Sequence, residues 1–90
     1  YKNFLEDYLY IIFDLIPDQV NIINNLLLSI LNKFKIFDIN SLDNINENLE
    51  DITIDYPYSK KYLIDILNLL YKNNFIELDY FNNFSNNLKD

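Results

Sequence analysis

Residues 58–70 read YSKKYLIDILNLL, and this stretch decides the fold class. Its apolar side chains recur three and four residues apart, which is the period of one face of an α-helix. Pro57 precedes the stretch and suits the first turn of a helix. We therefore predict an amphipathic helix that begins at Pro57 and forms the centre of the core. Its apolar face consists of Tyr58, Tyr62, Leu63, Ile66, Leu67 and Leu70.

The same spacing predicts helices on both sides of this one. The first runs from Phe4 to Ile16 and the second from Pro17 to Lys33. Leu26 and Leu28 widen the apolar stripe of the second helix, which predicts burial on more than one side. The stripe itself consists of Val20, Ile23, Leu27, Ile30, Leu31 and Phe34. Asp38 is a good N-cap for a third helix. Asn73-Asn74 supplies a residue that can adopt the left-handed conformation, at a position where glycine usually ends a helix. A last helix is predicted from about Glu77 to Leu88. The third helix carries Ile39, Leu42, Ile45 and Leu49 on one face.

Between the third and fourth helices, residues 51–55 read DITID and alternate polar and apolar side chains. This alternation is typical of a short strand, but no other segment offers a partner strand. We expect an extended loop that Ile52 and Ile54 pin to the core. The chain is thus predicted to be all-α, a single domain over residues 1–90 with about five helices stacked as antiparallel hairpins.

The composition excludes most catalytic and metal-binding chemistry. The chain has no Cys, His, Met or Trp, so carboxylates are its only strong metal ligands. Glu50, Asp51 and Asp55 could suggest a calcium site, but an EF-hand loop needs a glycine and a bidentate glutamate at fixed offsets. Asp51 and Asp55 could also form a glycosidase pair, although nothing in a small helical stack indicates a substrate cleft. We expect no catalytic residue, no metal and no cofactor.

The charge of the chain indicates the kind of partner. Seven lysines, no arginine and fourteen acidic residues give a net charge of −7. Such a field repels phosphate backbones and anionic membranes and favours basic proteins. No apolar run reaches the roughly 18 residues that cross a bilayer. We therefore expect a protein partner, with no direct binding of nucleic acid or membrane.

A longer pattern surrounds this acidic segment. It runs through LEDITIDYPYS at residues 49–59, continues with Tyr62-Leu63 and closes with Asn74-Phe75-Ile76. The pattern resembles the MA-three domain, the helical module of initiation factor four-G and programmed cell death four. Asp55-Tyr56-Pro57 matches the Asp-x-Pro element of that family, and Asn74 stands where glycine is usual. The resemblance covers the latter two-thirds of such a domain, so a first helical hairpin is expected before Tyr1.

The resemblance implies a HEAT-like stack and a binding function. Family members bind a DEAD-box RNA helicase of the initiation factor four-A type, as translation-initiation scaffolds or inhibitors, and related domains serve in splicing and ribosome assembly. By matching positions, Asp51, Asp55 and Pro57 contact the helicase, and Tyr56 joins them because we expect it to be exposed. The resemblance also implies a cytoplasmic location, or a nuclear one.

Less specific interpretations stay open beside this one. Asp51 and Asp55 could be ordinary turn or capping residues, because Asp before Pro commonly makes a turn. The stack could also belong to an unrelated helical-repeat protein that merely presents a groove. Tyr58 and Tyr62 are expected in the core on helical spacing, and Lys60 and Lys61 on a solvated helix face.

Overall fold

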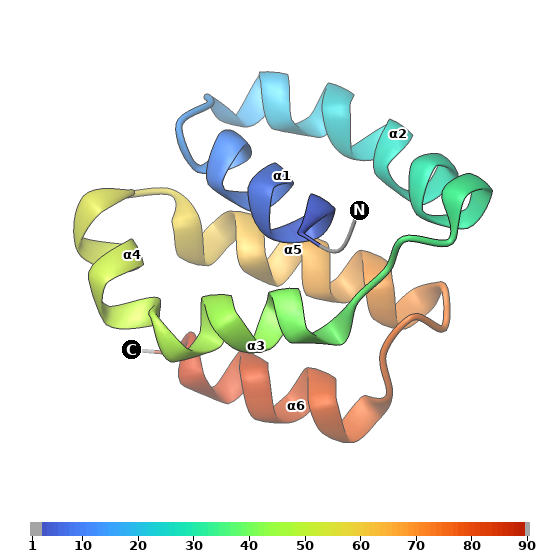
Figure 1. Ribbon diagram of the computed structural model, residues 1–90. Coiled ribbons are helices and arrows are strands. Elements are labelled where there is room, and N and C mark those ends of the chain that lie inside the picture. Colours follow the sequence, from blue (N-terminus) through green and yellow to red (C-terminus); the bar gives the residue numbers. More distant parts are fainter. Residues whose placement is uncertain (1–2, 90) are drawn as a thin grey trace.

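The computed structural model describes residues 3–89 and confirms the all-α prediction (Figure 1). Six helices form this part of the chain, and it contains no strand. Five of them correspond to predicted helices, whereas α4 occupies the segment expected to be an extended loop. The helices are α1 Phe4–Phe13, α2 Pro17–Phe34, α3 Ile39–Glu47, α4 Leu49–Asp55, α5 Ser59–Lys72 and α6 Leu78–Asn87.

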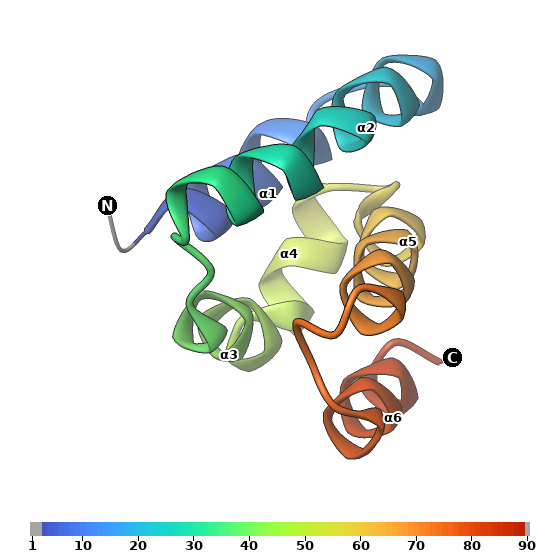
Figure 2. The same ribbon diagram turned by 90° about the vertical axis from the view of Figure 1, so that its right-hand side faces the viewer.

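Helix α5 is the centre of the fold, as the sequence predicts. It packs against α1, α2, α4 and α6, while α3 packs against α1 and α4. Helices α2 and α6 lie at opposite edges of the molecule (Figures 1 and 2). The single core extends between them and draws apolar side chains from all six helices.

The buried face of α5 follows the predicted stripe with one exception. Tyr62 and Leu67 are fully buried, but Tyr58 is 48% exposed, so its placement in the core was wrong. The reason is that the helix begins at Ser59, two residues after Pro57, and Tyr58 therefore precedes the first turn. The residues buried on α5 are Ser59, Tyr62, Leu63, Ile66, Leu67 and Leu70.

The extended loop expected at residues 51–55 is a helix instead. The Ile52 amide donates to the Asn48 carbonyl at 3.0 Å and the Tyr56 amide to the Ile52 carbonyl at 2.8 Å, which are helical hydrogen bonds. Side chains two positions apart in a helix point in directions that differ by about 200°, so Ile52 and Ile54 cannot both face the core. Ile52 is buried and Ile54 is 74% exposed.

Two local signals favour helix α4 and set its end. Glu50 and Asp51 lie in its first turn, where carboxylates interact favourably with the positive end of the helix dipole. Pro57 restricts Tyr56, which is extended with φ −127° and ψ 100°, so the helix ends at Asp55. Pro17 acts in the same way on Ile16, which is extended, and α1 therefore ends at Phe13, three residues before the predicted end.

The turn after α5 confirms the prediction for Asn74. This residue has φ 66°, in the left-handed region. The Phe75 amide donates to the Leu70 carbonyl at 2.9 Å and the Asn74 amide to the Tyr71 carbonyl at 3.1 Å. These two bonds form a Schellman motif, which satisfies the last carbonyls of the helix.

The predicted two-sided burial of α2 is wrong. Only one stripe of this helix is buried, formed by Val20, Leu27 and Leu31. Ile22 and Leu26 are 69% and 60% exposed, because α2 lies at the edge of the molecule (Figure 1). The start of helix α3 is as predicted, since Asp38 Oδ1 accepts a hydrogen bond from the Asn40 amide at 2.9 Å and so caps it. The helix ends at Glu47, however, and Leu49, expected on its apolar face, is the first residue of α4.

Candidate protein-binding surface

Helix α4 carries two of the four residues that the sequence singles out. Asp51 and Asp55 lie four residues apart, which places them on the same side of the helix, and both are exposed. Ile52, about 100° further around the helix than Asp51, faces the core. Pro57 is exposed just beyond the end of the helix. The structure therefore brings Asp51, Asp55 and Pro57 to the surface together, on a helix rather than on a loop.

Tyr56 has a different environment from the one expected. It is half-buried, and its ring centroid lies 5.5 Å from that of Phe13 and 6.3 Å from that of Tyr10. Both of these rings belong to α1. The expectation of an exposed Tyr56 is wrong because the residue before Pro57 is extended and directs the ring onto α1. Tyr56 thus anchors the end of α4 against α1.

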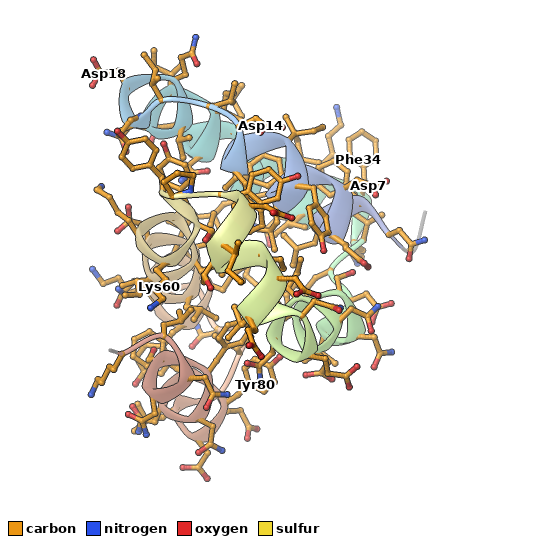
Figure 3. All side chains as sticks on the ribbon, turned by 90° about the vertical axis from the view of Figure 1, so that its left-hand side faces the viewer. Asp7, Asp14, Asp18, Phe34, Lys60 and Tyr80 are labelled. Carbon is orange, nitrogen blue, oxygen red and sulfur yellow. The ribbon has the colours of Figure 1, made fainter. Side chains whose placement is uncertain are left out.

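This anchor brings the charges of α1 next to those of α4. The pKa of Tyr10 is raised, mainly by burial and then by the negative charges of Glu6 and Asp51 and by Tyr56. Asp51 and Glu6, from two different helices, therefore act on the same phenol. In Figure 3, α1 and α4 lie side by side on the face toward the viewer, with Asp7 and Asp14 labelled on and beside α1.

We call the surface of these two helices the acidic face. It includes no lysine, because neither α1 nor α4 contains one, and the whole stretch from residue 36 to residue 59 lacks one too. Two isoleucines stand in this face, Ile11 at 61% exposure and Ile54 at 74%. The contribution of α1 was not predicted, although the absence of lysine from residues 3–32 is a visible signal of it. The carboxylates of the acidic face are Glu6, Asp7, Asp14, Glu50, Asp51 and Asp55.

Asp55 does not stabilise helix α4, in contrast to the carboxylates of the first turn. Asp51 and Asp55 are like charges at a spacing of four residues, which destabilises a helix by about 0.2–0.5 kcal/mol. Asp55 is also the last residue of α4, where a carboxylate meets the negative end of the dipole. The fold gains nothing from Asp55, and the exposed position of its carboxylate favours a role in binding.

Other parts of the surface offer little for chemistry. Among residues 3–89, no three acidic side chains are grouped so that they could hold a metal ion. A shallow depression of about 260 Å³ is lined by Leu15, Gln19, Ile22 and Ile23, none of which ionises. No helix in the described part of the chain combines the length and the apolar character needed to cross a membrane.

Comparison with known proteins gives no match: no family model, no curated protein and no solved structure resembles the chain closely enough to be matched. The resemblance to the MA-three domain rests on the residues quoted for it and stays a prediction.

Proposed function

We propose that the chain is a protein-binding module whose acidic face binds a basic surface of its partner. The observation that carries this proposal is the lysine-free surface of α1 and α4, which carries carboxylates together with two exposed isoleucines. Aliphatic side chains provide apolar contact area and carboxylates provide charge-assisted hydrogen bonds to Lys or Arg. Such a surface suits association with a protein better than catalysis, for which the chain lacks His and Cys.

The partner class that we propose is a DEAD-box RNA helicase of the initiation factor four-A type. It follows from the resemblance of residues 49–59 to the MA-three domain, in which acidic residues near Asp-x-Pro contact the helicase. Asp51 and Asp55 would meet basic residues of the helicase core. The chain would then act as a scaffold or an inhibitor in translation initiation, or beside a related helicase in splicing or ribosome assembly.

The helical form of α4 favours high affinity for a partner that binds these carboxylates. Side chains on a formed helix need less ordering on binding than those of a flexible loop, and ordering opposes affinity. Tyr56 holds the end of this helix against α1, because its ring contacts the rings of Phe13 and Tyr10. Asp51 and Asp55 are therefore presented in a fixed arrangement before the partner arrives.

Calorimetric titration of the 90-residue chain against a helicase core tests the proposal. We expect Asp55→Asn to weaken binding by at least about tenfold, since breaking a desolvated charge pair costs about 2–5 kcal/mol. Asp51→Asn should weaken it less, since an exposed pair contributes far less. Asp79→Asn on α6 removes the same charge from an exposed position outside the acidic face and serves as the matched control. It should leave the affinity within about twofold.

The outcomes separate the parts of the proposal. Equal losses for Asp55→Asn and Asp79→Asn would reduce the effect to net charge and remove the site. Absence of binding to the helicase core would remove the helicase as partner. The acidic face could then still be a binding site for another basic protein. That conclusion would require binding that Asp55→Asn weakens and Asp79→Asn does not.

A further inference from the structure

Helix α2 exposes one complete side to solvent. The helix lies at the upper edge of the molecule in Figures 1 and 2, and in the described part of the chain no other helix lies beyond it. Six residues share this side within an arc of about 100°, and every one of them is exposed. We call it the outer face of α2. Its residues are Asp18, Ile22, Asn25, Leu26, Ser29 and Lys33.

The order of residues on the outer face is self-complementary. Asp18 stands near its N-terminal end and Lys33 near its C-terminal end, and the residues between them, 19–32, carry no charge at all. In an antiparallel pair of α2 helices, with the twofold axis midway between Asn25 and Leu26, Asp18 lies opposite Lys33 of the copy. The same register places Ile22 opposite the small side chain of Ser29, and the two Leu26 side chains beside the axis.

We propose that the outer face of α2 binds the outer face of a second copy of this chain, in an antiparallel arrangement. Twofold contacts of this kind use the same patch on both subunits, and each pairing then occurs twice. Asp18 and Lys33 have no salt-bridge partner among the described residues, and the Lys33 ammonium lies 5.5 Å from the centroid of the Phe34 ring. Both charges are thus available to the copy.

The distribution of charge also favours this face over the others. The net charge of the chain is −7, so two copies repel one another in general. Helix α2 contains one aspartate and one lysine, and its own net charge is therefore zero. An α2 pair keeps the acidic faces of α1 and α4 out of the contact, and it places the helix dipoles antiparallel.

The size of the contact predicts its strength. One pair of helices buries less surface than the roughly 1,200 Å² at which stable specific interfaces begin. We therefore expect a weak dimer that dissociates on dilution. The apolar centre formed by Ile22 and Leu26 provides most of its stability, because exposed ion pairs contribute only about 0–1 kcal/mol each.

Sedimentation equilibrium of the 90-residue chain up to about 1 mM, the range of weak association, tests this inference. We expect a monomer–dimer equilibrium that Leu26→Glu weakens at least tenfold, because two added carboxylates meet beside the twofold axis. Leu78→Glu on α6 is the matched control, since it adds the same charge at a leucine that is 50% exposed, against 60% for Leu26, and that lies away from the outer face. It should leave the equilibrium unchanged.

Charge reversal tests the register. Asp18→Lys and Lys33→Asp alone should each weaken the dimer about threefold to tenfold, and the double variant should return it to within about threefold of the original chain, because the pairs are restored with opposite sign. Thermal unfolding of each variant verifies that the fold is kept. A chain that stays monomeric at the highest concentration overturns the inference, as does a dimer that Leu26→Glu leaves intact. A double variant no better than the single ones overturns the antiparallel register.

Discussion

The hydroxyl of Tyr62 donates a hydrogen bond to the backbone carbonyl of Leu15, 47 residues earlier in the chain. Tyr62 belongs to the central helix α5, and Leu15 to the link between α1 and α2. The tyrosine side chain is 1% exposed, so water cannot replace this bond. The hydrogen bond therefore fixes the α1–α2 hairpin on the central helix.

Tyr62→Phe should lower the free energy of unfolding by about 0.5–1.5 kcal/mol, the net value of a typical intramolecular hydrogen bond. The ring and its packing remain in this variant, so the loss measures the hydroxyl. Urea unfolding followed by circular dichroism gives the value. Tyr58→Phe is the matched control, because Tyr58 lies four residues earlier and is 48% exposed. An equal effect of both substitutions would mean that the Leu15 carbonyl finds water instead.

Leu67→Ala should lower the free energy of unfolding by about 2–5 kcal/mol, the range for truncating a buried leucine. Leu67 is fully buried on α5, which packs against four other helices. Ile64→Ala, on the same helix at 38% exposure, should cost clearly less. Chemical unfolding of the two variants side by side measures the difference, and similar losses would show that the core is not centred on this stripe.

Asn74→Gly should stabilise the chain by up to about 1 kcal/mol, and Asn74→Ala should destabilise it by about 1 kcal/mol. The reason is the φ of 66° at this residue, which glycine adopts without steric cost and alanine does not. Thermal unfolding of the two variants provides the measurement. If both variants shift the midpoint in the same direction, the turn after α5 does not need a left-handed residue.

The free energy of unfolding should fall as the pH rises above about 10. Burial raises the pKa of Tyr8 to about 12, from 10.0 in the unfolded chain. Burial also raises the pKa of Tyr80, and so do the 2.7 Å hydrogen bond to Asp43 and the charge of that carboxylate. The unfolded chain therefore loses these protons first, so the stability is complete below pH 10 and is lost as the pH rises through the folded pKa values.

Urea unfolding at a series of alkaline pH values tests this dependence. Tyr80→Phe should make the decline with pH less steep, because one of the tyrosines with a raised pKa is removed, whatever its effect at neutral pH. A free energy of unfolding that stays constant from about pH 9 to pH 11 would contradict the prediction.

The sequence by itself determined the all-α class and five helices, because their apolar side chains repeat with a helical period that no strand can satisfy. It also determined the left-handed turn at Asn74, since asparagine tolerates a positive φ better than other residues with a Cβ. For residues 51–55 the local pattern was ambiguous. Ile52 and Ile54 alternate as in a strand, and a segment this short cannot decide its own conformation.

Only the tertiary structure decided three features. Helix α4 forms because Ile52 is buried in the core while Tyr56 packs on Phe13 of α1. That contact joins carboxylates of residues 6–14 and 50–55 into one face. The lysine-free stretches are visible in the sequence, but their meeting in space is not. The sequence predicted the stripe of α2 that is buried, but it could not show that Leu26 and Phe34 at the margins of the apolar arc stay exposed. The position of α2 at the edge of the fold selected Val20, Leu27 and Leu31, because burial depends on which neighbours a helix has, and those neighbours come from distant parts of the chain.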